Sequence, residues 1–342
     1  MRDFEGFRKG VNLGGWFSQC DYSKERLDGF IKEEDFSVIA SWGLDHVRLP
    51  IDYNILETED GSSYLEEGFA RVQRAVDLCS KNSLNIILDL HKTAGYSFAA
   101  DSSQNSFFDS NDMQERFYRL WMEFARRFGN RDNIAFELLN EVTDKSYCQP
   151  WNRIASECIR RIRTICPKTY ILLGGYWNNS IEALPDLPMP QDEYIVYNFH
   201  CYEPFLFTHQ GAPWLGSIGM RPDFRIGFPV EADFYKKNMM DLFKELNGAL
   251  KDMDGTLDER AFESLFDKAV KLAEERNVPL YCGEYGVICY ANPEDTLRWY
   301  QAINSVFEKY KIGRAAWTYR SMHFGLCDDH MKGVLDRIKH VL

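Results

Sequence analysis

Eight short runs of apolar, often β-branched residues alternate with longer amphipathic stretches along the chain. This alternation indicates strands that are connected by helices and buried on both faces of a parallel sheet. Eight strands with a crossover after each one close into a barrel more readily than into an open sheet. The sequence therefore predicts an α/β fold, a (β/α)₈ TIM barrel. The predicted strands are Gly10–Trp16, His46–Ile51, Asn85–His91, Ile134–Glu141, Tyr170–Gly175, Tyr194–Tyr202, Leu280–Gly286 and Ala315–Arg320.

Helical periodicity fills most of the gaps between these strands. The predicted helices are Lys24–Ser41, Leu65–Lys81, Met113–Phe128, Trp151–Cys166, Arg260–Arg276 and Glu294–Tyr310, with a short helix at the C-terminus. Only the fifth connection, Asn179–Leu187, is brief. A barrel takes roughly 250 residues, so the 342 residues are expected to form one catalytic domain, 1–342, with room for an insertion.

The insertion is predicted at 206–259, between the sixth strand and its helix, as a subdomain with a helical pattern over Tyr235–Leu250. Because it follows a strand, it is expected on the C-terminal face of the barrel, where active sites form. We expect it to wall the ligand cleft; a decorative surface subdomain is the alternative.

Charge and motifs exclude several functions. The net charge of −12 argues against a nucleic acid or an anionic membrane surface as partner. The chain has no H-E-x-x-H, G-x-S-x-G or P-loop motif, and its seven histidines are dispersed. We therefore expect no metal and no cofactor, and a neutral or cationic ligand. A monomer is a separate expectation.

The nine cysteines include no C-x-x-C pair, which predicts buried free thiols in a reducing compartment. The N-terminus has no apolar signal region, and no apolar run is long enough to span a membrane. We expect a cytoplasmic protein, or a secreted one if a signal segment was removed.

Polar side chains end several of the predicted strands, where the catalytic residues of a barrel lie. Two of them are acids, Glu141 at the end of the fourth strand and Glu284 at the end of the seventh, and charge leaving a buried strand is costly unless it has a function. The others are Arg48, His91, Asn140, His200, Tyr202 and Trp317. Taken singly, each could be a structural ion-pair partner, a core residue whose hydrogen bonds are satisfied, or a residue that only packs. His46 and His209 are expected to be core residues whose hydrogen bonds are satisfied.

Two facing carboxylates suit the cleavage of a glycosidic bond, in which one acid protonates the leaving oxygen while the other attacks the anomeric carbon. A separation of about 5–5.5 Å between the carboxyl groups indicates retention of configuration, and roughly 6.5–9.5 Å indicates inversion.

These residues carry a family resemblance, because seven motifs occur in order between about residues 9 and 320. They are Gly-Val-Asn-Leu-Gly-Gly-Trp (10–16), His-Val-Arg-Leu-Pro (46–50), Leu-Asp-Leu-His (88–91), Asn-Glu (140–141), Asn-Phe-His-Cys-Tyr (198–202), Gly-Glu-Tyr-Gly (283–286) and Trp317. The chain resembles glycoside hydrolase family 5.

The resemblance implies a role for each residue. Glu141 is similar to the acid/base and Glu284 to the nucleophile, which Arg48 and Tyr202 would orient and keep ionised. Asn140 would bind the 2-hydroxyl of the sugar that is cleaved. His91 and His200 would be further polar groups of the same subsite, and Trp317 its aromatic floor. Outer subsites are expected at Trp177, Phe205 and Trp214.

One residue departs from the family pattern, since Val142 follows the Asn-Glu pair where proline is common. A β-branched residue also favours extended backbone, so we expect Glu141 to keep its role.

The resemblance implies a retaining endo-β-glucanase that hydrolyses β-1,4 bonds in cellulose-like or mixed-linkage β-1,3-1,4-glucans by double displacement. An exo-β-1,3-glucanase or a β-mannanase would share the catalytic residues. A non-catalytic glycan-binding barrel is disfavoured because both carboxylates are present.

Overall fold

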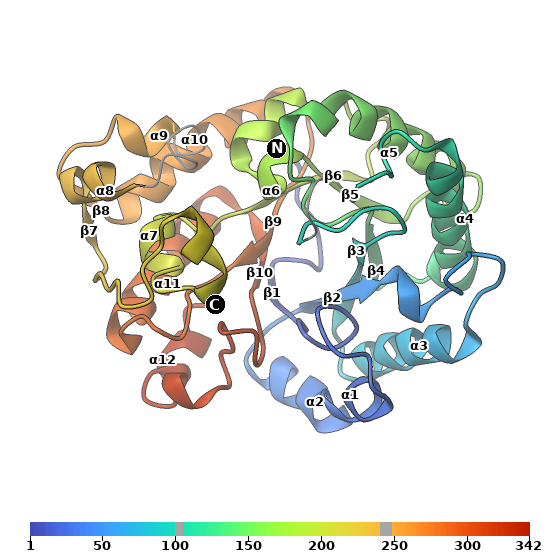
Figure 1. Cartoon of the computed structure of the whole chain (residues 1–342), viewed down its shortest axis with the longest axis horizontal. Helices are drawn as coiled ribbons and strands as arrows, with labels where there is room; N and C mark the ends of the chain where they lie inside the picture. Colours follow the sequence, from blue (N-terminus) through green and yellow to red (C-terminus); the bar gives the residue numbers. More distant parts are fainter. Residues whose placement is uncertain (100–104, 240–247) are drawn as a thin grey trace.

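The computed structural model describes residues 1–99, 105–239 and 248–342. Eight parallel strands form a closed barrel in the order β1-β2-β3-β4-β5-β6-β9-β10, which confirms the predicted fold (Figure 1). They are β1 Lys9–Asn12, β2 His46–Asp52, β3 Asn85–Lys92, β4 Ile134–Glu137, β5 Tyr170–Gly174, β6 Ile195–His200, β9 Leu280–Tyr285 and β10 Gly313–Ala316.

Helices surround the barrel and bury their apolar faces against it (Figure 1). The sequence contains their start signals: Ser110 caps the first and Asn292 the second of the two longest helices described. The main helices are α1 Lys24–Gly29, α2 Glu33–Ser41, α3 Glu66–Lys81, α4 Asn111–Phe128, α5 Cys148–Arg163, α10 Glu259–Glu275, α11 Pro293–Tyr310 and α12 Leu335–Lys339. No helix in these parts of the chain is long and apolar enough to cross a membrane.

At the amino ends of the strands the barrel interior is apolar, and the N-terminal segment closes it. Phe4 and Phe7 stack on each other with ring centroids 4.3 Å apart and belong to the same buried cluster as the inward-facing strand residues. That cluster also contains Ile87, Ala135, Leu172, Val196, Tyr281 and Ala315. The barrel is therefore a packed core at this end.

A layer of polar side chains lies nearer the carboxyl ends of the strands. Register places Asn12 beside Arg48 and Asp89 beside Glu137, and all four are fully buried. These positions share the inward-facing side of their strands with the apolar cluster, because side chains alternate with a period of two. The interior thus changes from apolar to charged along the barrel axis.

Three strands end four residues earlier than predicted, because β1, β4 and β10 end at Asn12, Glu137 and Ala316. The residues that follow leave the strands to build loops, among which Glu141 has a φ of 39°. A strand ladder cannot accommodate that left-handed backbone. The apolar run predicted for the fourth strand was thus correct in place but wrong in extent.

One predicted helix also differs, and the brief connection contains short helical elements. Lys24–Ser41 divides into α1 and α2, because the Asp35 carboxylate accepts from the Lys32 backbone N–H at 2.8 Å and starts a new helix. The brief fifth connection holds a short turn, α6 Tyr176–Asn179, and a 3₁₀ helix, Ile181–Asp186.

The segment 206–259 forms small elements beside α10 and α11 (yellow to orange in Figure 1). They are α7 Phe205–Thr208, a 3₁₀ helix Pro213–Ile218, α8 Ala232–Asn238, α9 Gly248–Lys251, and an antiparallel pair of β7 Val230–Glu231 with β8 Thr256–Leu257. The predicted helix Tyr235–Leu250 is wrong at its start and overlaps α8 and α9; its residues 240–247 lie outside the described chain.

Candidate active site

A cavity of about 830 Å³ opens at the carboxyl ends of the barrel strands. Seven of the eight predicted site residues line it, namely His91, Asn140, Glu141, His200, Tyr202, Glu284 and Trp317. The eighth, Arg48, is fully buried and bonded to two of the lining residues. The fold therefore brings the entire predicted set together.

Glu284 enters the cavity because of an irregularity in β9. Phe199 pairs with Cys282 and the next residue of β6, His200, with Glu284, so β9 holds one extra residue and bulges. A bulge re-aims the side chain that follows it. Both Glu284 oxygens then accept hydrogen bonds, Oε1 from Arg48 Nη1 and Oε2 from the Tyr202 hydroxyl, each at 2.8 Å.

Glu141 faces Glu284 from the loop after β4. Its backbone carbonyl accepts from the Tyr96 hydroxyl at 2.6 Å, which holds the left-handed turn. Its carboxyl oxygens contact His200 Nδ1 at 2.9 Å and the amide of Asn178 at 3.0 Å. Burial raises the pKa of Glu141, and the bond from Asn178 opposes this rise. A raised pKa suits an acid that must hold a proton near neutral pH.

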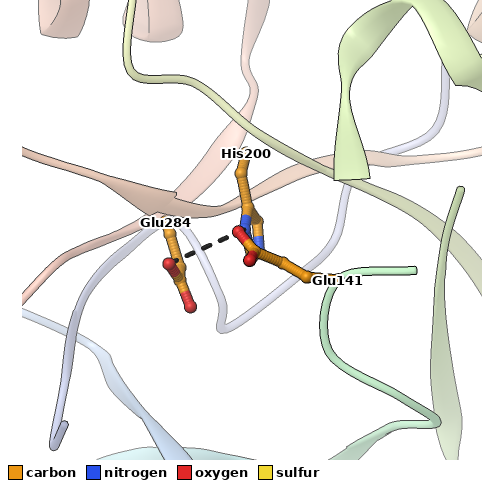
Figure 2. A group of neighbouring side chains, drawn as sticks. All are labelled: Glu141, His200 and Glu284. Carbon is orange, nitrogen blue, oxygen red and sulfur yellow. Dashed lines mark hydrogen bonds and ion pairs between the residues drawn. The ribbon is translucent and has the colours of Figure 1, made fainter. Parts of the chain in front are cut away.

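The two carboxylates meet at His200, and Figure 2 shows the three side chains converging. One ligand atom from each lies within 4.8 Å of the others. Such a group could offer three ligands to a cation. The guanidinium of Arg48, 2.8 Å from Glu284 Oε1, disfavours a metal there, because it already places a positive charge on that oxygen. These three side chains are therefore better suited to proton transfer than to metal binding.

Burial favours the neutral, hydrogen-bonding form of both histidines of the site. Burial lowers the pKa of His200 to about 4, and burial also lowers the pKa of His91. Asn179 donates to His200 Nε2 at 3.4 Å, so the ring hydrogen lies on Nδ1 and points at Glu141. His91 Nδ1 lies 2.6 Å from Asp89.

Sequence reasoning missed the partners of Arg48. Its guanidinium donates to both oxygens of Glu137 at 2.7 and 2.8 Å, and its Nη2 lies 3.0 Å from Asp89 Oδ2. Burial raises the pKa of Asp89 to about 7, although Arg48 opposes the rise. The signal was strand parity. Asp89 lies two residues before His91 on β3, and Glu137 lies two residues after the inward-facing Ala135 on β4, so both carboxylates fall on the inward faces of their strands.

Aromatic side chains line other parts of the cavity. Trp317 stacks on His91 with an interplanar angle of 5° and centroids 5.8 Å apart. Trp177, Phe205 and Trp214, the residues predicted for outer subsites, all line the cavity. Four residues of the 206–259 segment also line it: His209, Trp214, Leu215 and Ile218.

The remaining histidines and cysteines differ in part from expectation. His46 is a core residue, with Nε2 2.7 Å from the Tyr281 hydroxyl. His209 packs on Phe205 at 4.2 Å between ring centroids but also lines the cavity. All nine thiols are free, and five are buried as predicted; Cys20, Cys148, Cys289 and Cys327 are only partly buried.

The chain is similar to several known proteins along most of its length. Cellodextrinase A of Ruminococcus flavefaciens is 50% identical over 92% of this chain and 86% of its own length. Endoglucanase C of Acetivibrio thermocellus is 38% identical over 98% of both chains. The crystal structure of the clostridial cellulose synthase subunit Z of Clostridioides difficile superposes with a TM-score of 0.77, at 26% identity, over 98% of this chain and 99% of that one. The profile of the cellulase family, glycosyl hydrolase family 5, matches residues 7–323, and the chain belongs to that family.

Proposed function

We propose that the chain is a retaining endo-β-1,4-glucanase that acts on cellulose-like or mixed-linkage β-1,3-1,4-glucans without a metal or cofactor. The observation that carries the proposal is the environment of the two acids. Glu284 accepts a hydrogen bond on each oxygen, as a nucleophile should, whereas burial favours the protonated form of Glu141. Their closest oxygens lie within 4.8 Å, which supports retention over inversion.

In the first step Glu284 attacks the anomeric carbon while the glycosidic carbon–oxygen bond breaks. Glu141 gives its proton to the leaving sugar oxygen, so the step produces a glycosyl ester on Glu284 and a free sugar hydroxyl. Arg48 and Tyr202 orient the attacking carboxylate. Because their donors are fixed before the substrate binds, little reorganisation is needed during the reaction.

In the second step Glu141, now ionised, takes a proton from water whose oxygen attacks the same carbon. The ester bond to Glu284 breaks, and the product leaves with its original anomeric configuration. Glu141 is protonated again and ready for the next cycle.

Three further residues bind the sugar that is cleaved. The Asn140 amide oxygen accepts from Arg48 at 2.9 Å, which turns its NH₂ group outward as a donor for the 2-hydroxyl. His91, whose Nε2 lies 2.8 Å from the Gln19 amide nitrogen, is a further polar group of this subsite, and Trp317 provides a flat apolar floor. Bonds that tighten as the oxocarbenium-like transition state forms accelerate the reaction.

The wider cleft holds the rest of the glucan in this proposal. The 206–259 segment walls one side through Trp214 and its neighbours, while Trp177 and Phe205 provide outer subsites. We further propose that residues 1–342 act as one catalytic domain and as a monomer, since one chain supplies every group used above.

Two measurements test the chemistry. An activated 2-deoxy-2-fluoro-glucoside should label Glu284, which peptide mass spectrometry identifies; labelling of another residue would falsify the assignment. Proton NMR of early products should show a retained anomeric configuration, and an inverted product would exclude double displacement.

A substrate panel tests the specificity. The names of the two relatives, cellodextrinase and endoglucanase, favour glucans and cellodextrins as substrates. We expect hydrolysis of barley β-glucan, lichenan and carboxymethylcellulose to products of several sizes, and little action on laminarin or mannan. Laminarin degraded to glucose alone would indicate the exo-β-1,3-glucanase alternative, rapid cleavage of mannan the β-mannanase, and binding without hydrolysis a glycan-binding barrel.

A further inference from the structure

We propose that Glu137 is a positioning residue of the catalytic pair, which holds Arg48 in the orientation that Glu284 and Asn140 require. This inference rests on the proposed function. Glu137 is fully buried on β4 and does not line the cavity, so it does not touch the substrate. It acts through the guanidinium.

The guanidinium of Arg48 is planar and offers five N–H groups in a fixed fork. One edge, Nε and Nη2, donates to both Glu137 oxygens at 2.7 and 2.8 Å. The next edge carries Nη1, which donates to Glu284 Oε1 at 2.8 Å. A two-bond contact on one edge of a rigid plane fixes the direction of the other edge. Glu137 therefore determines where Nη1 points, together with the Asn12 amide oxygen that accepts from Nη1 at 2.9 Å.

The same plane sets the orientation of Asn140. Nη2 of Arg48 donates to the Asn140 amide oxygen at 2.9 Å, which leaves the amide NH₂ group for the cavity. If the guanidinium rotated, the amide could turn over and present an acceptor to the sugar. Glu137 therefore influences both the attack on the anomeric carbon and the contact with the sugar.

Asp89 is a second acid beside the Arg48 guanidinium, so the position of the guanidinium depends on a partner that holds it in place. Asp89 Oδ2 lies 3.0 Å from Nη2, and its second oxygen has no hydrogen-bond partner among the described residues. Asn198 donates to Glu137 Oε1 at 2.8 Å and keeps this carboxylate in place. Without Glu137, the Nε–H of Arg48 would lose its acceptor and the side chain would shift towards Asp89.

Stability alone gives little reason for such a buried pair, because well-packed apolar residues of similar volume are often as stabilising. The chain contains a matched example outside the site: Arg116 Nε donates to Glu57 at 2.7 Å, and both residues are buried. Glu57 does not line the cavity. Its variant therefore shows what the loss of a buried ion pair does by itself.

The test compares Glu137→Gln with Glu57→Gln in reaction with an activated 2-deoxy-2-fluoro-cellobioside. Intact mass spectrometry gives two quantities, the fraction of chains that becomes labelled and the rate constant of labelling at Glu284. A purely structural defect lowers the labelled fraction. A positioning defect lowers the rate constant in chains that are folded and competent.

We expect Glu137→Gln to lower the rate constant by about 10- to 100-fold at full labelled fraction, as a misplacement of about 1 Å can do. Glu57→Gln should keep the wild-type rate constant. An equal rate constant in the two variants overturns the proposal, as does a loss confined to the labelled fraction.

Glu137→Asp serves if the glutamine variant does not fold, because it keeps the charge. Its carboxylate is one methylene shorter and cannot hold both Nε and Nη2 in the same place. A slowed rate constant supports the proposal, and a wild-type rate contradicts it. If the wild-type chain is not labelled at Glu284 at all, the proposed function fails instead.

Discussion

Replacement of Glu141 with Gln removes the proton that the first step needs while keeping the size of the side chain. The new amide retains one acceptor oxygen for His200 Nδ1. Its NH₂ group faces the amide of Asn178, which is exposed and free to turn its own oxygen inward. We therefore expect a folded variant with a melting temperature close to that of the wild type.

The expected loss follows from the two chemical contributions of the acid. General acid catalysis is worth about 10²- to 10⁴-fold, or roughly 3 to 5 kcal/mol. A sugar hydroxyl is a poor leaving group, so the loss of kcat/KM on a β-glucan should lie near the upper end of that range. A dinitrophenolate leaves without protonation, so kcat/KM on a dinitrophenyl cellobioside should fall by less than about tenfold.

The assay determines kcat/KM on barley β-glucan and on the aryl cellobioside for the wild type and the variant. The second step also loses its base, so kcat and KM on the aryl substrate should fall together as the glycosyl ester accumulates. Glu57→Gln is the control, because Glu57 is a buried acid that does not line the cavity. It should keep kcat/KM on both substrates.

Equal losses on the two substrates would refute the reasoning, because they would mean that Glu141 does not protonate the leaving group. A Glu141→Gln variant that retains more than a tenth of the wild-type kcat/KM on the glucan would refute it as well.

Three further substitutions test a contact of Glu141, the charge of Glu182 and the packing of Gly68. Asn178→Ala removes a bond that lowers the pKa of Glu141, so the basic limb of the kcat/KM profile on β-glucan should move to higher pH; a shift to lower pH would contradict the contact. Burial, followed by the charge of Glu203, raises the pKa of Glu182 to about 8, above the ordinary value of 4.5. The protonated form of Glu182 stabilises the fold fully below pH 4.5, and this contribution is lost as the pH rises through about 8. Glu182→Gln should therefore reduce the fall of the melting temperature between these pH values, which calorimetry measures. Gly68→Ala would place a methyl group 1.7 Å from the Ile55 carbonyl oxygen; it should lower the free energy of unfolding by about 1–3 kcal/mol without changing kcat per labelled site, and an unchanged denaturation midpoint would exclude the clash.

The family and the site were predictable because local signals carry them. Apolar runs with crossover helices predict the barrel, and polar residues at the ends of those runs predict the site. The expectation that Glu141, Glu284 and their neighbours share one cavity required only that parallel strands present their carboxyl ends at one face. Their chemical types then suggested the reaction.

Strand extents and helix breaks were less predictable, since they depend on backbone geometry that an apolar pattern does not report. The run that ends at Glu141 reads as one strand, yet the ladder stops at Glu137. The bond from Tyr96, which lies far away in sequence, holds the turn that follows. A hydrogen bond from a distant residue leaves no local trace in the sequence.

The sequence by itself determined the barrel, the two acids and their class of chemistry, because each depends on residue types in a periodic pattern. Only the tertiary structure decided how the acids are held: the bulge in β9 that turns Glu284 inward, and the three carboxylates around Arg48. Glu137 looks like any strand residue in the sequence. Its importance lies in hydrogen bonds across the closed barrel to Arg48 on β2, and barrel closure is what brings those atoms within bonding distance.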